Sequence, residues 1–497
     1  MSRFATLAAL GLGLLIVLVA TFYPFDVSFK CAVLRSHLGF SALVWGKTDA
    51  SDVMKNILLF VPLGFGLSGL LMKKRGRSRR WLVSVVFLSS FALSGTIEIL
   101  QIFMPSRFPS LADVLANSAG GLLGFLCFRL WLWMCGNPLF SMVAYAALTF
   151  LISIHLQRST SLSNWDNTFP LLVGNEQTGD RPWRGCISEF YIANKALLPA
   201  EVSDIASKRR PIPSLGNSLL AWYQWTGRGS YRDAIHKLPV LIWNGQAERG
   251  QGRGMLLGPE NWLETAGPAA YVTQRIARTS QFTLGVTMAP EEIYQTGPAR
   301  LVSVSVDPFR RNLTLGHEGR SLVVRLRTPE TGENGMNPEL TVPEIFNTRD
   351  IRNLMITYDG STLSVYVDGR LNAHSLELSP GPIAVDKLFS PMVVNVKLSR
   401  LLYYAVIFLP LGILSSVSLR GSGSNFQLRS LAVAGAVLIS PFILESLLAG
   451  VSGRNAKLEN LLPGFVFVSI AMLLTSLRPR WDASSCERNE RLLSEKT

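Results

Sequence analysis

Eight apolar runs, each about twenty residues long, constrain this chain more than any other feature. A transmembrane helix needs about 20 mostly apolar residues, and such runs lie at 4–23, 54–72, 81–103, 110–133, 138–156, 399–419, 431–450 and 459–477. The first follows Arg3 as a signal peptide would, but it continues into TFYPFD without a small-residue cleavage site. We therefore expect it to remain as a spanning anchor, within a bundle of about eight transmembrane helices.

The composition agrees with a membrane protein that also carries a large soluble part. Of the 497 residues, 48% are apolar and only 16% are charged, whereas soluble domains average about 25% charged. The net charge is +14, but six basic residues lie together in KKRGRSRR at 73–80, between two apolar runs. That arrangement is typical of a cytoplasmic loop beside a membrane, so we expect no nucleic-acid partner.

The basic loop also orients the chain, because lysine and arginine concentrate in cytoplasmic loops. With 73–80 inside, the N-terminus, 420–429 and the tail lie inside, and 24–51 and 158–398 lie outside. We predict a multi-pass protein of the bacterial inner (cytoplasmic) membrane in four parts. These are a five-helix domain 1–157, a periplasmic domain 158–398, a three-helix unit 399–477 and a cytoplasmic tail 478–497.

The cysteines do not predict a metal centre. None of the five forms a CxxC pair or a metal-ligand spacing: Cys31, Cys127, Cys135, Cys186 and Cys486. A bond between Cys31 and Cys186 stays open if both face an oxidising compartment. We expect no cofactor.

Polar side chains interrupt three consecutive apolar runs at the ends that this orientation places outside. Residues three or four apart share one face of a helix. The candidate ligand-binding residues are the pairs Asp52 and Asn56, Glu98 and Gln101, and Asp113 and Asn117, with Arg107 in the turn MPSRFPS.

Ionisable side chains inside a helix bundle are functional candidates by default, because burying them is costly. The alternative is structural, since Asp113 near a helix start suits the helix dipole. Glu98 lies near a C-terminal helix end, where the dipole disfavours a carboxylate. Capping alone therefore does not explain the set.

Residues of about 20–135 resemble the VanZ family, small membrane proteins named for a role in resistance to the glycopeptide teicoplanin. The resemblance rests on DVMKNILLFVPLGF and IEILQIFMPSRFPSLADVLANSAGGLLG. The family pattern carries over onto Glu98, Gln101, Arg107, Asp113, Asn117, Gly120 and Gly121. Asn56 stands where the family often has a histidine, which weighs against a mechanism based on imidazole. The activity of the family is not firmly defined, so the resemblance implies a place in the cell envelope more than a reaction.

A second, weaker copy of this pattern follows near the C-terminus. FVPLGF at 60–65 recurs as FLPLGI at 408–413, and Arg454 follows Glu445 by nine residues, as Arg107 follows Glu98. We interpret 399–477 as a degenerate parallel repeat of the second to fourth helices, with chance similarity of leucine-rich segments as the alternative. The other counterparts are Glu459 and Asn460 in LENLLPGF, Leu448 for Gln101, Tyr404 for Asn56 and Arg400 for Asp52. We expect any chemistry to remain in the first copy.

Short alternating runs rich in Gly, Pro and Asn predict an all-β domain at 158–398. Asp359-Gly360 and Asp368-Gly369 are typical of tight hairpin turns, and a two-sheet jelly roll is the natural closure for many short strands. SLLAWYQW at 218–225 and ITYDGSTLSVYVDGRL at 356–371 resemble the concanavalin A-like lectin/glucanase superfamily in its laminin G-like form. Residues 171–202 resemble that family's closing strands, yet come first, so we predict a circular permutation inserted between helices five and six.

Six tryptophans are candidate sugar-stacking platforms, although core packing is the more common role of each: Trp165, Trp183, Trp222, Trp225, Trp243 and Trp262. No E-x-D-x-E-like string supplies the paired carboxylates of a glucanase, so we expect no hydrolysis by this domain. Some relatives use calcium, and calcium in this domain stays open, although no compact Asp-rich loop is present.

These features favour a membrane protein of the cell envelope or of exopolysaccharide metabolism, rather than an enzyme. The expected partners are the lipid bilayer and a glycan or lipid-linked polysaccharide, with Arg107 pairing with its phosphate or carboxylate. One alternative is a membrane enzyme that uses Glu98 or Asp113 as a general base. Another is an assembly protein whose polar cluster only locks helices together, and a transporter is a weaker third.

Overall fold

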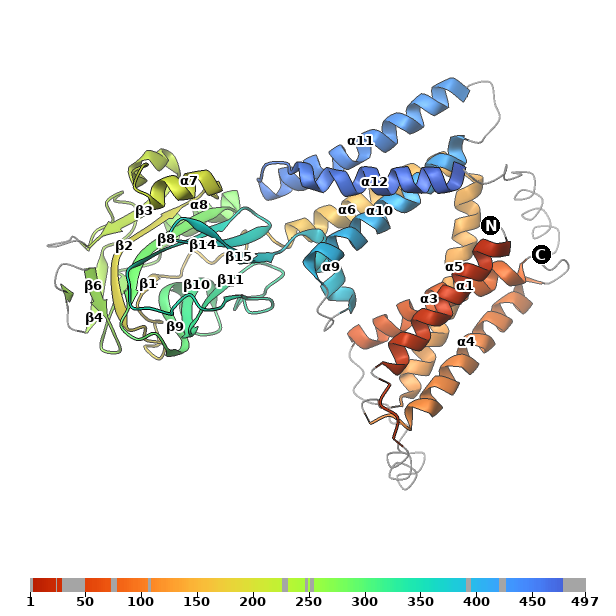
Figure 1. The fold of residues 1–497 in the computed structure, drawn as a ribbon, viewed down its shortest axis with the longest axis horizontal. Helices are drawn as coiled ribbons and strands as arrows, with labels where there is room; N and C mark the ends of the chain where they lie inside the picture. Colours follow the sequence, from red (N-terminus) through yellow and green to blue (C-terminus); the bar gives the residue numbers. More distant parts are fainter. Residues whose placement is uncertain are drawn as a thin grey trace. The chain divides into compact units, whose positions relative to one another are not determined.

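A computed structural model describes residues 3–23, 25–28, 50–72, 78–105, 109–225, 231–245, 249–250, 254–389, 395–419 and 426–476 (Figure 1). The chain divides into two compact units. The first comprises 1–148, 384–439 and 463–497, and the second comprises 149–383 and 440–462. The second unit thus contains the end of one apolar helix and the turn between two others, in addition to the β domain.

All eight apolar runs are helical, as predicted. The helices are α1 (Arg3–Phe22), α3 (Ala50–Leu71), α4 (Arg79–Gln101), α5 (Leu111–Gly136), α6 (Pro138–Arg158), α10 (Val396–Leu419), α11 (Phe426–Ser452) and α12 (Leu458–Ser476). Within the described residues, six are long and apolar enough to cross a membrane. The other two, α1 and α11, count only as shorter apolar helices, at Leu10–Phe22 and Val437–Ser452. The chain is a membrane protein by the length and composition of these helices.

Glycines bring the first helices into close backbone contact. A methyl group on Gly64 of α3 would overlap the carbonyl of Gly121 on α5, and one on Gly66 would lie 2.7 Å from Leu10 Cα on α1. Small residues allow such approach between membrane helices. Beside this seam, Val17 of α1 and Phe60 of α3 pack in one buried apolar cluster. The first run is therefore an integral part of the helix bundle.

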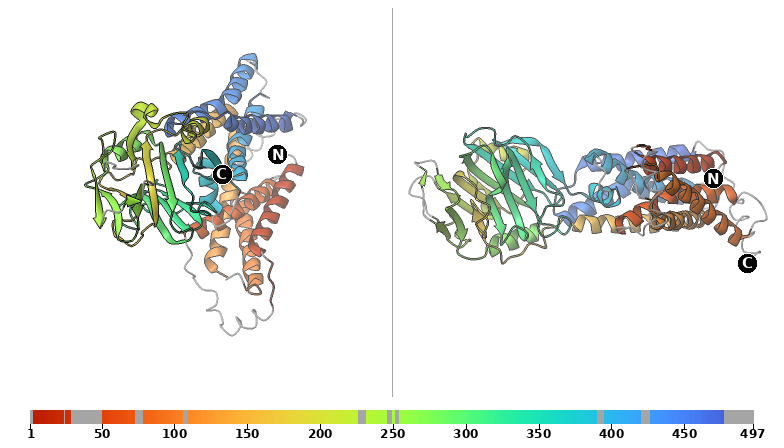
Figure 2. Two further views of the ribbon diagram at one scale, coloured as in Figure 1. Left: turned by 60° about the vertical axis from the view of Figure 1, so that its left-hand side comes forward. Right: turned by 90° about the horizontal axis from the view of Figure 1, so that it is seen from below.

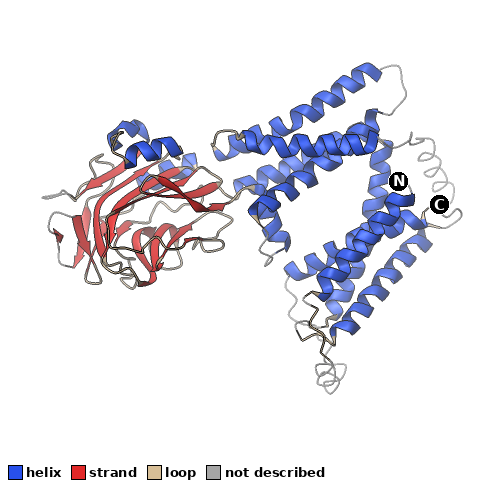
Figure 3. Ribbon diagram, in the orientation of Figure 1, coloured by secondary structure: helices blue, strands red, loops and turns tan. Residues whose placement is uncertain are grey.

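The β domain is a sandwich of two antiparallel sheets (Figures 2 and 3). Over the described residues, the first sheet has the order β12-β11-β10-β9-β1-β7-β4, and the second has the order β15-β14-β13-β8-β2-β6-β5 with β3 also paired to β2. One apolar core lies between them. The strands are β1 (Leu171–Val173), β2 (Gly185–Ala193), β3 (Leu219–Gln224), β4 (Leu241–Gly245), β5 (Arg249–Gly250), β6 (Gly254–Leu257), β7 (Asn261–Thr265), β8 (Phe282–Pro290), β9 (Gln295–Ser305), β10 (Arg311–Gly319), β11 (Ser321–Leu326), β12 (Leu340–Val342), β13 (Arg352–Tyr358), β14 (Thr362–Val367) and β15 (Arg370–Glu377).

The segment that precedes the predicted opening strand supplies an interior strand to each sheet. β1 pairs with β9 and β7, and β2 pairs with β8 on one edge and with β3 and β6 on the other. These strands therefore complete a single sandwich, as expected. The sequence did not predict three short helices: α7 (Pro199–Ala206), α8 (Ala270–Thr279) and α9 (Pro380–Phe389).

The tryptophans divide into two groups. Trp165, Trp183 and Trp225 are buried in the sandwich core, where they are not available for stacking on a sugar. Trp222, Trp243 and Trp262 are half-buried. Packing is thus the role of at least half of the candidate platforms.

Candidate functional site

Glu98 joins the end of α4 to the start of α5. Its side chain is only 4% exposed, and its Oε2 accepts a hydrogen bond of 2.9 Å from the backbone N–H of Ser110. Ser110 is the residue before the first turn of α5, where backbone N–H groups lack helical partners. The carboxylate therefore satisfies one of these donors while it lies inside the helix bundle.

Two predicted amides form further hydrogen bonds between helices. Gln101 donates 2.9 Å from its Nε2 to the carbonyl of Thr21 on α1, and Asn117 donates 2.9 Å from its Nδ2 to the hydroxyl of Ser94 on α4. Both amide side chains are buried. Glu98, Gln101 and Asn117 therefore tie together α1, α4 and α5, and we call these three residues the first polar cluster.

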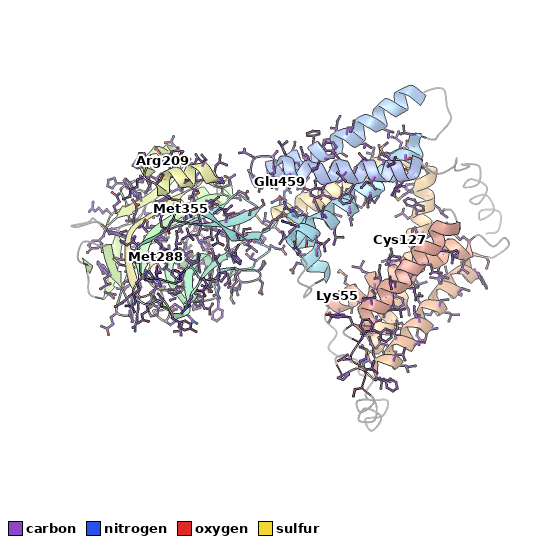
Figure 4. All side chains as sticks on the ribbon, viewed as in Figure 1. Lys55, Cys127, Arg209, Met288, Met355 and Glu459 are labelled. Atoms are coloured by element: carbon purple, nitrogen blue, oxygen red, sulfur yellow. The ribbon has the colours of Figure 1, made fainter. Side chains whose placement is uncertain are left out.

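Of the other predicted residues, Asp113 lies close enough to Glu98 for the two carboxyl groups to interact electrostatically. Asp113 lies half-buried in the first turn of α5, where the helix dipole favours an acid. Asp52 is 55% exposed and pairs at 3.1 Å with Lys55 on its own helix (Lys55 is labelled in Figure 4). Asn56 is half-buried, and Arg107 lies outside the described residues.

The two glycines of the family pattern serve packing. A methyl group on Gly120 would overlap the carbonyl of Ile57 on α3, and one on Gly121 would overlap the Ser90 hydroxyl on α4. They allow α3, α4 and α5 to approach at the level of the first polar cluster. The two glycines therefore contribute to the site only by letting the helices that carry its side chains pack closely.

A second polar cluster surrounds Glu445, near the end of α11. Glu445 is 3% exposed and receives two hydrogen bonds from Arg454, at 2.6 Å from Nη1 to Oε1 and at 3.1 Å from Nη2 to Oε2. The backbone N–H of Lys457 donates to Oε1 at 2.8 Å, and Asn460 Nδ2 donates to Oε2 at 3.1 Å. Glu459, at the start of α12, is exposed (Figure 4). The second polar cluster consists of Glu445, Arg454, Lys457 and Asn460.

The two clusters share several spacings. Each glutamate accepts from a backbone N–H twelve residues further along the chain. Gly412, in the second PLG string, would place a methyl group 2.7 Å from the carbonyl of Val468. In the first copy, a methyl group on Gly64 would likewise meet the carbonyl of Gly121. Asn117 and Ser94 have no such parallel, because Gly464 and Pro441 stand at the corresponding places.

Sequence reasoning missed a link between the second polar cluster and the sandwich. Lys457 Nζ lies 3.0 Å from Asp359 Oδ2 in the β13–β14 turn. Burial alone would raise the pKa of Asp359, but Lys457 and the backbone N–H groups of Thr362 and Ser361 hold it below its usual value. In the same turn, the Gly360 carbonyl accepts from Gln157 at 3.1 Å and from Thr160 at 2.8 Å. No local signal pairs residues so far apart in the sequence.

The described residues contain no group of three or more His, Cys, Asp or Glu side chains that could hold a metal ion. Cys31 lies outside these residues, so the question of its bond with Cys186 stays open. The functional groups in the two polar clusters are mainly carboxylates, amides and a guanidinium, which can form hydrogen bonds and ion pairs.

Comparison with known proteins agrees with the N-terminal assignment. Residues 10–132, about a quarter of the chain, match the VanZ/LLP1 family model. The match spans α1 to α5 and contains the first polar cluster, which indicates a membrane protein linked to the cell envelope. No curated protein and no solved structure matches the chain.

Proposed function

We propose that the first polar cluster forms the base of a binding site for an amphipathic ligand with an anionic head, such as a lipid-linked polysaccharide intermediate. The supporting observation is a carboxylate, Glu98, held 4% exposed within the helices that match VanZ/LLP1. Burying a carboxylate among membrane helices is energetically costly, and such residues commonly mark functional sites. Asp113 and, from its sequence position, Arg107 belong to the same end of these helices, at the outer face of a bacterial cytoplasmic membrane.

We infer that 399–477 is a degenerate copy in which the ligand role is gone. The shared twelve-residue hydrogen bond and the paired Gly64 and Gly412 contacts support the repeat. In this copy the Glu445 carboxylate accepts four hydrogen bonds from the chain itself. A carboxylate satisfied in this way has little capacity left for a ligand.

The sandwich supplies a second binding surface, which we propose recognises a glycan or an envelope protein. On the face of the first sheet that points away from the core, half-buried Trp262 lies across from Asn244 on the neighbouring strand. Glu264, two residues on, accepts from Gln177 at 2.8 Å and from Asn244 at 3.1 Å. An aromatic face beside amides and a carboxylate suits a sugar ring and its hydroxyl groups.

The first polar cluster is tested with Glu98→Gln in the full-length protein. Because glutamine can still accept from Ser110, we expect near-normal abundance. In the proposed site Glu98 would hold Arg107, the group that pairs with the phosphate. Binding of a short-chain polyprenyl phosphate in detergent, measured by thermophoresis, should therefore weaken at least about tenfold when that charge-assisted support is lost. Glu459→Gln, an exposed acid at the start of α12, is the matched control and should bind as the wild type does.

The alternatives give different outcomes. An assembly protein would lose abundance in Glu98→Gln without a change in affinity of the remaining protein. A membrane enzyme would convert the polyprenyl substrate, and only Glu98→Gln would stop the conversion. Wild-type protein that binds no polyprenyl phosphate would contradict the proposal.

The sandwich is tested on a glycan array with the full chain in detergent. Trp262→Ala should abolish any glycan signal that the wild type gives, because each stacked ring contributes strongly to sugar binding. Phe309→Ala, which removes a 74% exposed ring elsewhere in the sandwich, should leave it unchanged. Equal signals from both variants would argue against this face.

A further inference from the structure

Arg311, the first residue of β10, carries a buried charge that the chain does not neutralise. Its side chain is 0% exposed. Among the described residues, none of its three guanidinium nitrogens has a hydrogen-bond partner. A guanidinium has five N–H donors, and buried donors are nearly always paired.

The neighbouring charges do not compensate for it. Arg300 and Arg325 lie nearby, and each already has its own acid: Arg300 Nε lies 2.8 Å from Glu176 Oε2, and Arg325 Nε lies 2.6 Å from Glu339 Oε2. Ser305, the cross-strand neighbour of Arg311, donates to the other oxygen of Glu176.

The remaining nearby acid is also engaged. Asp307 binds Arg310 Nε at 2.8 Å and accepts from the backbone N–H groups of Phe309 and Arg310. Three buried arginines thus share two buried or half-buried glutamates. One positive charge is left over.

Arg311 keeps that charge at neutral pH. Burial and the charge of Arg300 lower its pKa only to about 10. A buried ion without a counter-ion is costly, so the fold must either hydrate this group or pair it.

The surroundings limit what could pair with it. The segment between β11 and β12 borders this end of β10. The backbone N–H of Arg311 donates to the Glu333 carbonyl at 3.1 Å, and that of Arg327, directly after β11, donates to the Asn312 carbonyl at 2.9 Å. Any partner must be as enclosed as the Arg311 side chain itself, which is 0% exposed, and this favours a compact group. The parallel N–H groups of a guanidinium favour a carboxylate or phosphate, and they also bind a single halide.

We propose that Arg311 is the centre of an enclosed anion-binding site in the sandwich, which takes one compact anion. The anion is either a free inorganic ion or the carboxylate of an acidic sugar ligand. This site is separate from the first polar cluster and from the Trp262 face. It stands or fails independently of both.

The test is equilibrium dialysis of the full-length protein in detergent against labelled chloride, phosphate and glucuronate, at an ionic strength held constant with a bulky sulfonate. We expect saturable binding of about one anion per chain, as one guanidinium provides one such pair of donors. Arg311→Met should weaken it at least about tenfold. Arg310→Met, which changes the neighbouring 61% exposed arginine, should bind as the wild type does.

The three anions separate the two sources. Binding of chloride or phosphate identifies a free inorganic ion, whereas binding of glucuronate alone identifies a ligand carboxylate. If Arg311→Met does not fold, Arg311→Lys keeps the charge but loses the paired N–H groups, and its affinity should fall. Absence of saturable binding of all three anions to the wild type would overturn the proposal and leave water as the partner. So would unchanged binding in a folded Arg311→Met protein.

Discussion

Replacing Arg454 by methionine is expected to lower the free energy of unfolding by about 3–5 kcal/mol, the usual cost of removing one partner from a buried ion pair. Arg454 and Glu445 are only 5% and 3% exposed and share two hydrogen bonds. Without the guanidinium, the Glu445 carboxylate stays buried with neutral donors only. The measurement is equilibrium unfolding of the full-length protein in detergent.

The double variant Glu445→Gln/Arg454→Met should recover part of that loss, because no uncompensated charge then remains. Asp52→Asn is the matched control, since the exposed pair with Lys55 contributes no more than about 1 kcal/mol. Losses that simply add in the double variant would show that the two side chains do not act as a pair.

Replacing Gly64 by alanine is expected to separate α3 from α5. The added methyl group would overlap the carbonyl of Gly121, and the Gly121 Cα would be 2.9 Å away. Backbone atoms cannot rotate aside as side chains do, so a helix must move. Overpacking of this kind costs about 1–3 kcal/mol or more, measured as a loss of thermal stability in detergent.

Gly95→Ala on α4 is the control for the intrinsic difference in helix stability between glycine and alanine. No atom lies within 4 Å of a methyl group there, and alanine is favoured over glycine in a helix by about 0.5–1 kcal/mol. Both substitutions replace glycine by alanine, but we expect Gly64→Ala to lower the stability of the protein and Gly95→Ala to raise it. Equal effects would mean that the α3–α5 contact is less tight than described.

The sequence predicted the helices better than their contacts. Hydropathy alone located all eight helices, because twenty apolar residues have few other structures open to them. Spacing placed Glu98 and Gln101 on one helix face, and the structure confirms that both are buried. Spacing does not say which face turns inward, and Asp52 instead forms a surface pair with Lys55.

In the sandwich, alternation and Asp-Gly turns predicted strands such as β8, β13 and β14, and the early segment was correctly joined to the same domain. The buried arginines were not foreseen. Arg311 carries no sequence signal of burial, yet its side chain is 0% exposed and its backbone N–H bonds to the carbonyl of Glu333 in the segment after β11. Burial that depends on a distant loop leaves no periodic signal.

The turn between β13 and β14 has a mechanical consequence. It is bonded to the last turn of α6 through Gln157 and Thr160 and to the segment between α11 and α12 through Lys457. Force applied to the sandwich would therefore be transmitted through these contacts to the ends of three apolar helices, α6, α11 and α12. A displacement of the sandwich would therefore load these helix ends directly.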